Sequence, residues 1–97
     1  MSRYVVLLRF TEKGVAKSED SVARAEAFQK VAAQVNARIE GQYWTTGPYD
    51  GVLIIDAPDE TTAAALVLRL GKDANVSTCM LRAFDAEEFA SVLKKIV

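Results

Sequence analysis

The sequence contains no histidine and only one cysteine among its 97 residues. Without histidine, the chain lacks the commonest general base and the commonest metal ligand, and it cannot build a Ser-His or Cys-His nucleophile pair. We therefore expect no zinc site, no facial-triad iron site and no cofactor. The single thiol, Cys79, cannot form an intrachain disulfide, and we interpret it as a buried apolar side chain rather than a reactive group.

An excess of charge of one sign is also missing. The formal net charge is −1, and the only adjacent basic pair is Lys94-Lys95. Because neutralised phosphates supply most of the affinity for nucleic acid, a nucleic-acid partner is not expected. The apolar run from Tyr4 to Leu8 is too short for a membrane span or for the core of a signal peptide. We expect a cytoplasmic protein that binds neither nucleic acid nor membranes.

Apolar residues, in contrast, are plentiful. Hydrophobic residues make up 51% of the chain and charged residues 26%. This balance is globular but slightly apolar for a chain that suits one domain, which we assign to residues 1–97. Because small domains have a large surface for their volume, the excess indicates that some apolar surface is buried against a partner.

Hydrophobic periodicity predicts four strands and three helices. Apolar runs bounded by turn signals place the strands at residues 3–10, 39–46, 49–57 and 75–84. Apolar residues at spacings of three and four place the helices at residues 18–37, 60–70 and from 86 onward. The order of elements along the chain is therefore β-α-β-β-α-β-α.

Capping residues mark the ends of the predicted helices. Ser18 and Asp59 are suitable N-caps for the first and second helices, and Gly71 stands where the second helix would end. Asp85 and Glu88 have the spacing of a capping box at the start of the last helix.

This order of elements favours the ferredoxin-like, or split βαβ, arrangement within the α+β class. Right-handed crossovers and a hairpin between the second and third strands give an antiparallel sheet of order 4-1-3-2. The two strands that this topology makes central, residues 3–10 and 49–57, are also the most apolar. Polarity and topology therefore agree.

The two central strands carry apolar side chains on both faces, although two helices can cover only one face of the sheet. We expect the open face to pack against a second copy of the chain, because an uncovered apolar patch favours aggregation. Alternatively, the last helix covers part of that face. In either interpretation, its apolar side chains point inward; these are Phe89, Val92, Leu93 and Ile96.

The turn at Gly47-Pro48 gathers the candidate site residues. Asp50 is either a general base or ligand anchor, or a hydrogen-bond acceptor that holds the hairpin. Tyr43, Trp44 and Tyr49 either line a pocket or form cross-strand and subunit contacts. Because side chains alternate along a strand, Tyr43 and Trp44 must point to opposite faces.

Two arginines near the ends of neighbouring strands are further candidates. Arg9 and Arg82 suit the binding of an anionic group. Alternatively, they form salt bridges at the edge of the sheet, for which the available carboxylates are Asp56, Asp85 and Glu12.

The chain resembles the GYD-domain family over nearly its whole length. The resemblance lies in the opening strand from Tyr4, the segment Gln42–Gly47, the Tyr49-Asp50 pair, the strand that ends at Asp56–Asp59 and the closing strand Thr78–Phe84. Pro48 stands between Gly47 and Tyr49, which alters the turn rather than the fold. The resemblance implies a place in the dimeric α/β-barrel group, in which ferredoxin-like units pack sheet to sheet.

Three hypotheses for function follow. The first is a homo-oligomer that binds a small molecule in a pocket between sheet and helices or between subunits. The second is a cofactor-free enzyme, similar to the monooxygenases and isomerases of the wider group, in which Tyr49 and Asp50 handle a proton and Arg82 holds an anion. The third is an assembly subunit without a ligand. Fold alone cannot choose among them.

Overall fold

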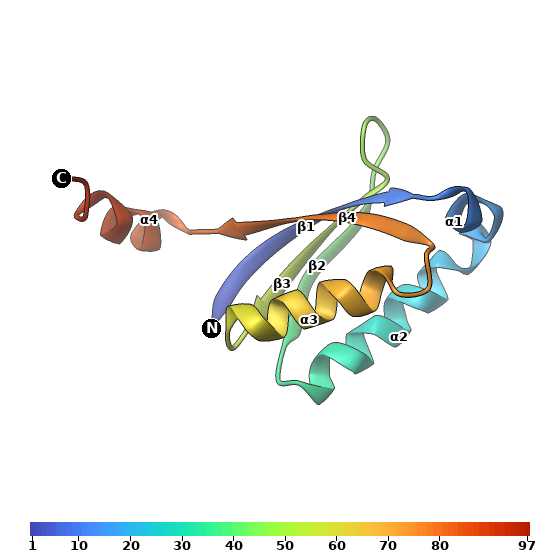
Figure 1. The fold of residues 1–97 in the computed structure, drawn as a ribbon, viewed down its shortest axis with the longest axis horizontal. Helices are drawn as coiled ribbons and strands as arrows, with labels where there is room; N and C mark the ends of the chain where they lie inside the picture. The colour runs from blue at the N-terminus through green and yellow to red at the C-terminus, as the bar shows by residue number, and fades with distance from the viewer.

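A four-stranded sheet, covered on one face by two long helices, forms the body of the molecule (Figure 1). The computed structural model describes residues 1–97. The strands are β1 (Ser2–Phe10), β2 (Arg38–Trp44), β3 (Gly51–Ala57) and β4 (Val76–Ala83). The helices are α1 (Glu12–Ala16), α2 (Ser21–Gln34), α3 (Glu60–Gly71) and α4 (Ala86–Leu93), with a 3-10 turn at Ser18–Asp20.

The sheet has the order β2-β3-β1-β4, and every neighbouring pair is antiparallel. This is the predicted order read from the other edge, so the ferredoxin-like α+β fold is confirmed. Side chains from β1 and β3 meet α2 and α3 in one core between the sheet and the helices. That core is built from Tyr4, Val6, Phe28, Ala32, Ala37, Leu53, Ile55, Ala57, Ala63 and Leu66.

The segment between β1 and α2 differs from the prediction. The sequence predicts a polar connection over residues 11–17, but these residues contain α1, whose N-cap Thr11 accepts a hydrogen bond from the Gly14 N–H at 3.1 Å. Gly14 lies against the turn before β4, where an added Cβ would stand 1.9 Å from the carbonyl oxygen of Asn75. This contact lies 61 residues along the chain, so local periodicity could not predict it.

The hairpin between β2 and β3 is wider than predicted. β2 ends at Trp44 and β3 begins at Gly51, so residues 45–50 form a loop in which Gly47 has a φ of 109°. The loop rises from the sheet on the side opposite α2 and α3 (Figure 1). Its end is tied to β1 as well as to the end of β2. The Asp50 N–H donates to the Leu8 carbonyl at 2.8 Å, and the Thr45 N–H, directly after β2, donates to the Asp50 carbonyl at 2.9 Å.

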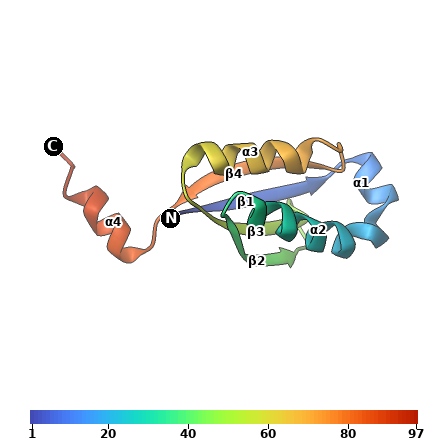
Figure 2. The same ribbon diagram turned by 90° about the horizontal axis from the view of Figure 1, so that it is seen from below.

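The last helix projects away from the body, and the expectation that its apolar side chains point inward is wrong. Both ribbon views show α4 beyond the end of the sheet (Figures 1 and 2). Phe89, Val92, Leu93 and Ile96 are between 40% and 71% exposed. The predicted capping box is present at Asp85 and Glu88 and starts the helix directly after β4. No helix in the structure is both long and apolar enough to cross a bilayer.

The predicted boundaries are close for α3 but wrong for α2, which spans Ser21–Gln34 rather than residues 18–37. Ser18 begins the 3-10 turn and does not cap the helix. Asp59 caps α3 by accepting the Thr62 N–H at 2.7 Å, and this bond lowers the pKa of the Asp59 carboxyl. Gly71, expected just beyond α3, is its last residue.

The face of the sheet opposite α2 and α3, here called the open face, is bare and apolar at its centre. Strand register places on it Val5, Leu7, Tyr43, Val52, Ile54, Cys79 and Leu81. Cys79 is exposed there, so its interpretation as a buried side chain is wrong. The alternative in which the last helix covers this face is also wrong for the single chain.

Candidate functional site

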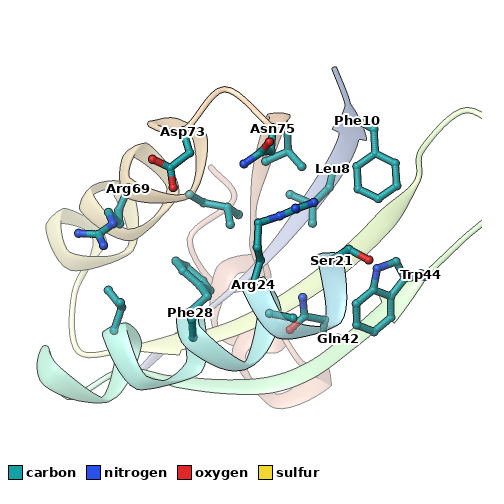
Figure 3. A pocket seen from close by; sticks show the side chains of 15 residues that line it. Leu8, Phe10, Ser21, Arg24, Phe28, Gln42, Trp44, Arg69, Asp73 and Asn75 are labelled. Carbon is teal, nitrogen blue, oxygen red and sulfur yellow. The ribbon is translucent and has the colours of Figure 1, made fainter. Parts of the chain in front are cut away.

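A cavity of about 180 Å³ opens on the helix-covered side, between α2, the end of α3 and the sheet (Figure 3). Its walls are mainly apolar, with aromatic rings from β1, α2 and β2. The apolar and aromatic side chains among its lining residues are Leu8, Phe10, Ala25, Ala27, Phe28, Val31, Trp44, Leu70 and Val76. Concave apolar sites with a few polar groups are the usual form of a small-molecule site.

Two amide side chains in the cavity wall have an oxygen without a partner. Gln42 comes from β2 and Asn75 from the turn before β4, and the oxygens Oε1 and Oδ1 are buried and accept no hydrogen bond. Asn75 is only 9% exposed. Leaving a buried acceptor unpaired costs about 1–3 kcal/mol, and such groups are rare in folded proteins.

Charged side chains surround the cavity without forming ion pairs. Arg24 from α2, Arg69 from α3 and Asp73 from the following turn line it. None of the three takes part in a salt bridge, since all the salt bridges involve Arg3, Arg38 or Arg82. Arg24 uses one N–H, from Nη1 to the Lys17 carbonyl at 3.0 Å, and a guanidinium has five donors.

The turn that carries Asp73 and Asn75 is fixed by α1 and its cap. The Thr11 N–H donates to the Asn75 carbonyl at 3.1 Å, and Lys13 Nζ donates to the Asp73 carbonyl at 2.7 Å. Between them, Ala74 has a φ of 62°, a conformation that needs such support. The backbone that carries the Asn75 side chain is therefore held in place by hydrogen bonds within the protein.

Of the residues predicted from the sequence, Trp44 lines this cavity, and Tyr43 lies on the open face. The two neighbours thus point to opposite faces, as strand alternation requires. The remaining predicted residues, Tyr49, Asp50, Arg9 and Arg82, are not among those that line it.

Asp50 and Tyr49 make contacts that connect the β2–β3 loop to the end of β1. Asp50 Oδ2 accepts the Phe10 N–H at 2.8 Å, so its carboxylate supports a strand end. Arg9 lies over the Tyr49 ring, 4.9 Å from its centroid. A cation over a ring face is attracted by the ring quadrupole, so this contact holds the loop against β1.

Arg9 and Arg82 lie at opposite ends of the sheet, because Arg9 is paired with Ser77 and Arg82 with Tyr4. One small anion cannot contact both side chains within one chain. Arg82 lies over the ring of Phe84 at 4.4 Å and is 3.8 Å from Glu88. Glu88 thus takes the place of the carboxylates that the sequence suggested for a salt bridge with Arg82.

Paired charges border one end of the open face. Arg3 donates to Glu40 at 3.1 Å, and Arg38 donates to Glu40 at 3.0 Å and to Asp56 at 3.4 Å. The hydrogen bonds from Arg3 and then Arg38 lower the pKa of the Glu40 carboxyl, and Glu40 raises the pKa of Arg3. The open face therefore has an apolar centre with paired charges along one edge of it, here called the charged rim.

Sequence reasoning missed the polar residues of the cavity. Gln42 offered a weak signal, since it is a polar residue at an inward position of an aromatic strand. No sequence pattern distinguishes Arg24, Arg69 or Asp73 from other charged residues, and Asn75 is predicted to begin a strand. Their convergence depends on how α2, α3 and the turn pack.

Together, these features define a small ferredoxin-like α+β protein with a cavity on its covered face and an apolar open face. The sequence pattern of the GYD domain matches residues 4–93, and the chain belongs to the GYD-domain family.

The chain is also similar to a curated protein and to a solved structure, both from Thermus thermophilus. The chain is 30% identical to a glutamine synthetase and cystathionine beta-lyase binding protein, over 97% of this chain and all of that one. A crystal structure from the same organism superposes with a TM-score of 0.55 at 25% identity, covering 89% of this chain and 96% of the other.

Proposed function

We propose that this protein is a self-associating binding protein. Two copies pack their open faces together, and each keeps a small-molecule cavity on its helix-covered side. The observation that carries the self-association is the bare open face, with Val5, Leu7 and Ile54 at its centre and the charged rim along one edge.

Exposed apolar side chains near the C-terminus suggest that α4 takes part in the association. Phe89 and Leu93 on α4, and Ile96 just beyond its end, are between 49% and 71% exposed. Exposed side chains of this kind are suited to the apolar centre of an interface.

Native mass spectrometry of the purified chain tests the self-association, with a dimer as the expected result. Ile54→Lys places a charge at the centre of the open face and should give a folded monomer. Gln29→Lys, an equal change in charge on the exposed side of α2, should leave the dimer intact. A monomeric parent protein at micromolar concentration would overturn the proposal.

The cavity supports binding of a small molecule. It combines ring-sized apolar space with two buried amide oxygens that lack donors, from Gln42 and Asn75. If the protein were an assembly subunit without a ligand, the free-energy cost of burying these two unpaired oxygens would have no explanation. The same native spectra would show any bound metabolite as extra mass for each chain.

Binding of another protein is a second candidate function, and the name of the Thermus relative favours it. The apolar side of α4 is a suitable surface because it projects clear of the body (Figure 2). Surface plasmon resonance against purified glutamine synthetase and cystathionine beta-lyase tests this candidate. Truncation after Ala83 should abolish any binding that α4 carries.

The geometry gives less support to the cofactor-free enzyme. Asp50, which that hypothesis needs as the proton acceptor, holds the Phe10 N–H and lies outside the lining of the cavity. Arg82, its proposed anion holder, lies at the far end of β4, beside Glu88.

A further inference from the structure

We propose that the cavity binds a small zwitterion with an apolar body, the chemical class of free α-amino acids with an aliphatic or aromatic side chain. This inference rests on the proposed small-molecule function and narrows it to one class of ligand. Three properties of the cavity lead to it: its size, its unpaired amide oxygens and the mixture of charges at its edge.

The size limits the apolar part of the ligand. The cavity measures about 180 Å³, and a cavity of about 150 Å³ accepts a benzene molecule. One ring or one branched aliphatic chain therefore fills the space between Phe28, Leu70 and Trp44. A nucleotide is too large, and the long chain of a fatty acid would need a tunnel.

The amide oxygens require hydrogen-bond donors from the ligand. Gln42 Oε1 and Asn75 Oδ1 are buried acceptors without a protein donor. Rotating either amide by 180° would instead place an NH₂ donor at the same point, for which a ligand carboxylate is a suitable acceptor. A ligand with an ammonium group provides three N–H donors and satisfies such acceptors.

The charges distinguish a zwitterion from a simple anion. Asp73 and Asn75 lie together at one side of the cavity with Arg69, and Arg24 rises from α2 between them and Trp44 (Figure 3). Two guanidinium groups without carboxylate partners suit a carboxylate, which arginine binds through paired N–H donors. Asp73 would repel a dicarboxylate, but it attracts an ammonium group.

Hydrogen bonds hold the turn that carries Asp73 and Asn75, so these two side chains start from a fixed stretch of backbone. Thr11, Lys13 and Gly14 of α1 and its cap hold the backbone of residues 73–75. Binding then requires little ordering of the protein, and preorganised polar groups discriminate strongly between ligands that do and do not satisfy them.

Trp44 provides the readout, because it is the only tryptophan and it lines the cavity. The full chain is titrated with L-leucine, L-methionine and L-phenylalanine while indole emission is followed. The matched probes are 3-phenylpropionate, which lacks the ammonium group, and 2-phenylethylamine, which lacks the carboxylate. We expect at least one amino acid to bind. We also expect each matched probe to bind about tenfold or more weakly than L-phenylalanine.

Gln42→Leu separates a ligand-binding role from a structural one. It removes the unpaired acceptor, so the free protein should melt about 4 °C higher, while binding of the amino acid weakens about tenfold. Arg24→Gln should weaken binding by a similar factor. The controls are Gln29→Leu, on the exposed side of α2, and Arg38→Gln, in the charged rim, and they should leave the affinity unchanged.

The outcomes distinguish the two levels of the proposal. If 3-phenylpropionate or 2-phenylethylamine binds as tightly as L-phenylalanine, the zwitterion class is wrong, although the small-molecule function stands. Unchanged affinity in Gln42→Leu and Arg24→Gln would also overturn the assignment. If no probe changes the emission and the purified protein carries no extra mass, both proposals fail.

Discussion

The covered and open faces of the sheet carry similar aliphatic side chains, but their polar groups differ in whether they have partners within the protein. On β3, Leu53 and Ile55 are 0% exposed beneath the helices, while Val52 and Ile54 point to the bare side. On the open face, the charged groups of Arg3, Arg38 and Glu40 satisfy one another. Under the helices, the side-chain oxygens of Gln42 and Asn75 accept no hydrogen bond, and the charged groups around the cavity form no salt bridge.

This difference shows that strand composition does not reveal which face is covered. Alternation along β1 and β3 sorts side chains into two sets, but both sets are apolar. What separates the faces is the cover that α2 and α3 supply and the state of the polar groups. The charges on the open face already have partners within the protein. The amide oxygens in the cavity have none, so they are available to a ligand.

The largest expected contrast comes from neighbouring isoleucines on opposite faces. Ile55→Ala should lower the free energy of unfolding by about 2–5 kcal/mol, because it leaves a cavity in the core. Ile54→Ala should cost about 1 kcal/mol or less at concentrations where the chain is monomeric, since no helix packs on it. Urea denaturation of dilute protein measures both. Equal losses would mean that the open face is structurally covered.

A second contrast concerns two glycines near the cavity. Gly14→Ala should destabilise the protein by about 1–3 kcal/mol, because the new Cβ would meet the Asn75 carbonyl at 1.9 Å. At Gly71, the nearest atom to an added Cβ is 4.0 Å away, so Gly71→Ala serves as the matched control. It should be neutral or stabilise by up to about 1 kcal/mol, because alanine favours helix. A harmless Gly14→Ala would show that the turn at Asn75 is not held tightly.

Tyr43 and Trp44 offer a reciprocal test of the two faces. Tyr43→Lys should weaken self-association about tenfold or more and leave the cavity intact, because it adds a charge to the open face. Trp44→Leu should leave the oligomer intact but remove a wall of the cavity. Native mass spectrometry and ligand-induced thermal shifts separate the effects. A variant that alters both properties would show that the faces are coupled.

The smallest expected effect is the acid response of the charged rim. Arginine hydrogen bonds lower the pKa of Glu40 from its usual value of 4.5. The folded state therefore gains stability above that pH and loses it as the pH falls through the lowered pKa. Glu40→Gln should be less stable than the parent protein at pH 7, and the difference should vanish in acid. Glu26→Gln, on the exposed side of α2, is the control for a change in charge. A difference that persists at low pH would rule out the ion pairs as its cause.

The sequence predicted the strand order and the caps at Asp59 and Asp85 because these depend on local patterns. Periodicity and crossover handedness determine the topology, and a capping box spans only four residues. It did not predict α1, the direction of α4 or the exposure of Cys79, since each depends on contacts between distant segments. The polar part of the cavity was missed for the same reason: Gln42, Arg24 and Asn75 come from three separate elements.

Cys79 lies unpaired and exposed on the open face, level with Leu7 in the neighbouring strand. The protein thus carries a built-in footprinting probe at the surface where copies are proposed to meet. The rate at which a maleimide alkylates this thiol reports the fraction of chains whose open face is free. Dilution should speed the alkylation, and Ile54→Lys should make its rate independent of protein concentration, so that one chemical reaction at a native residue follows the association equilibrium.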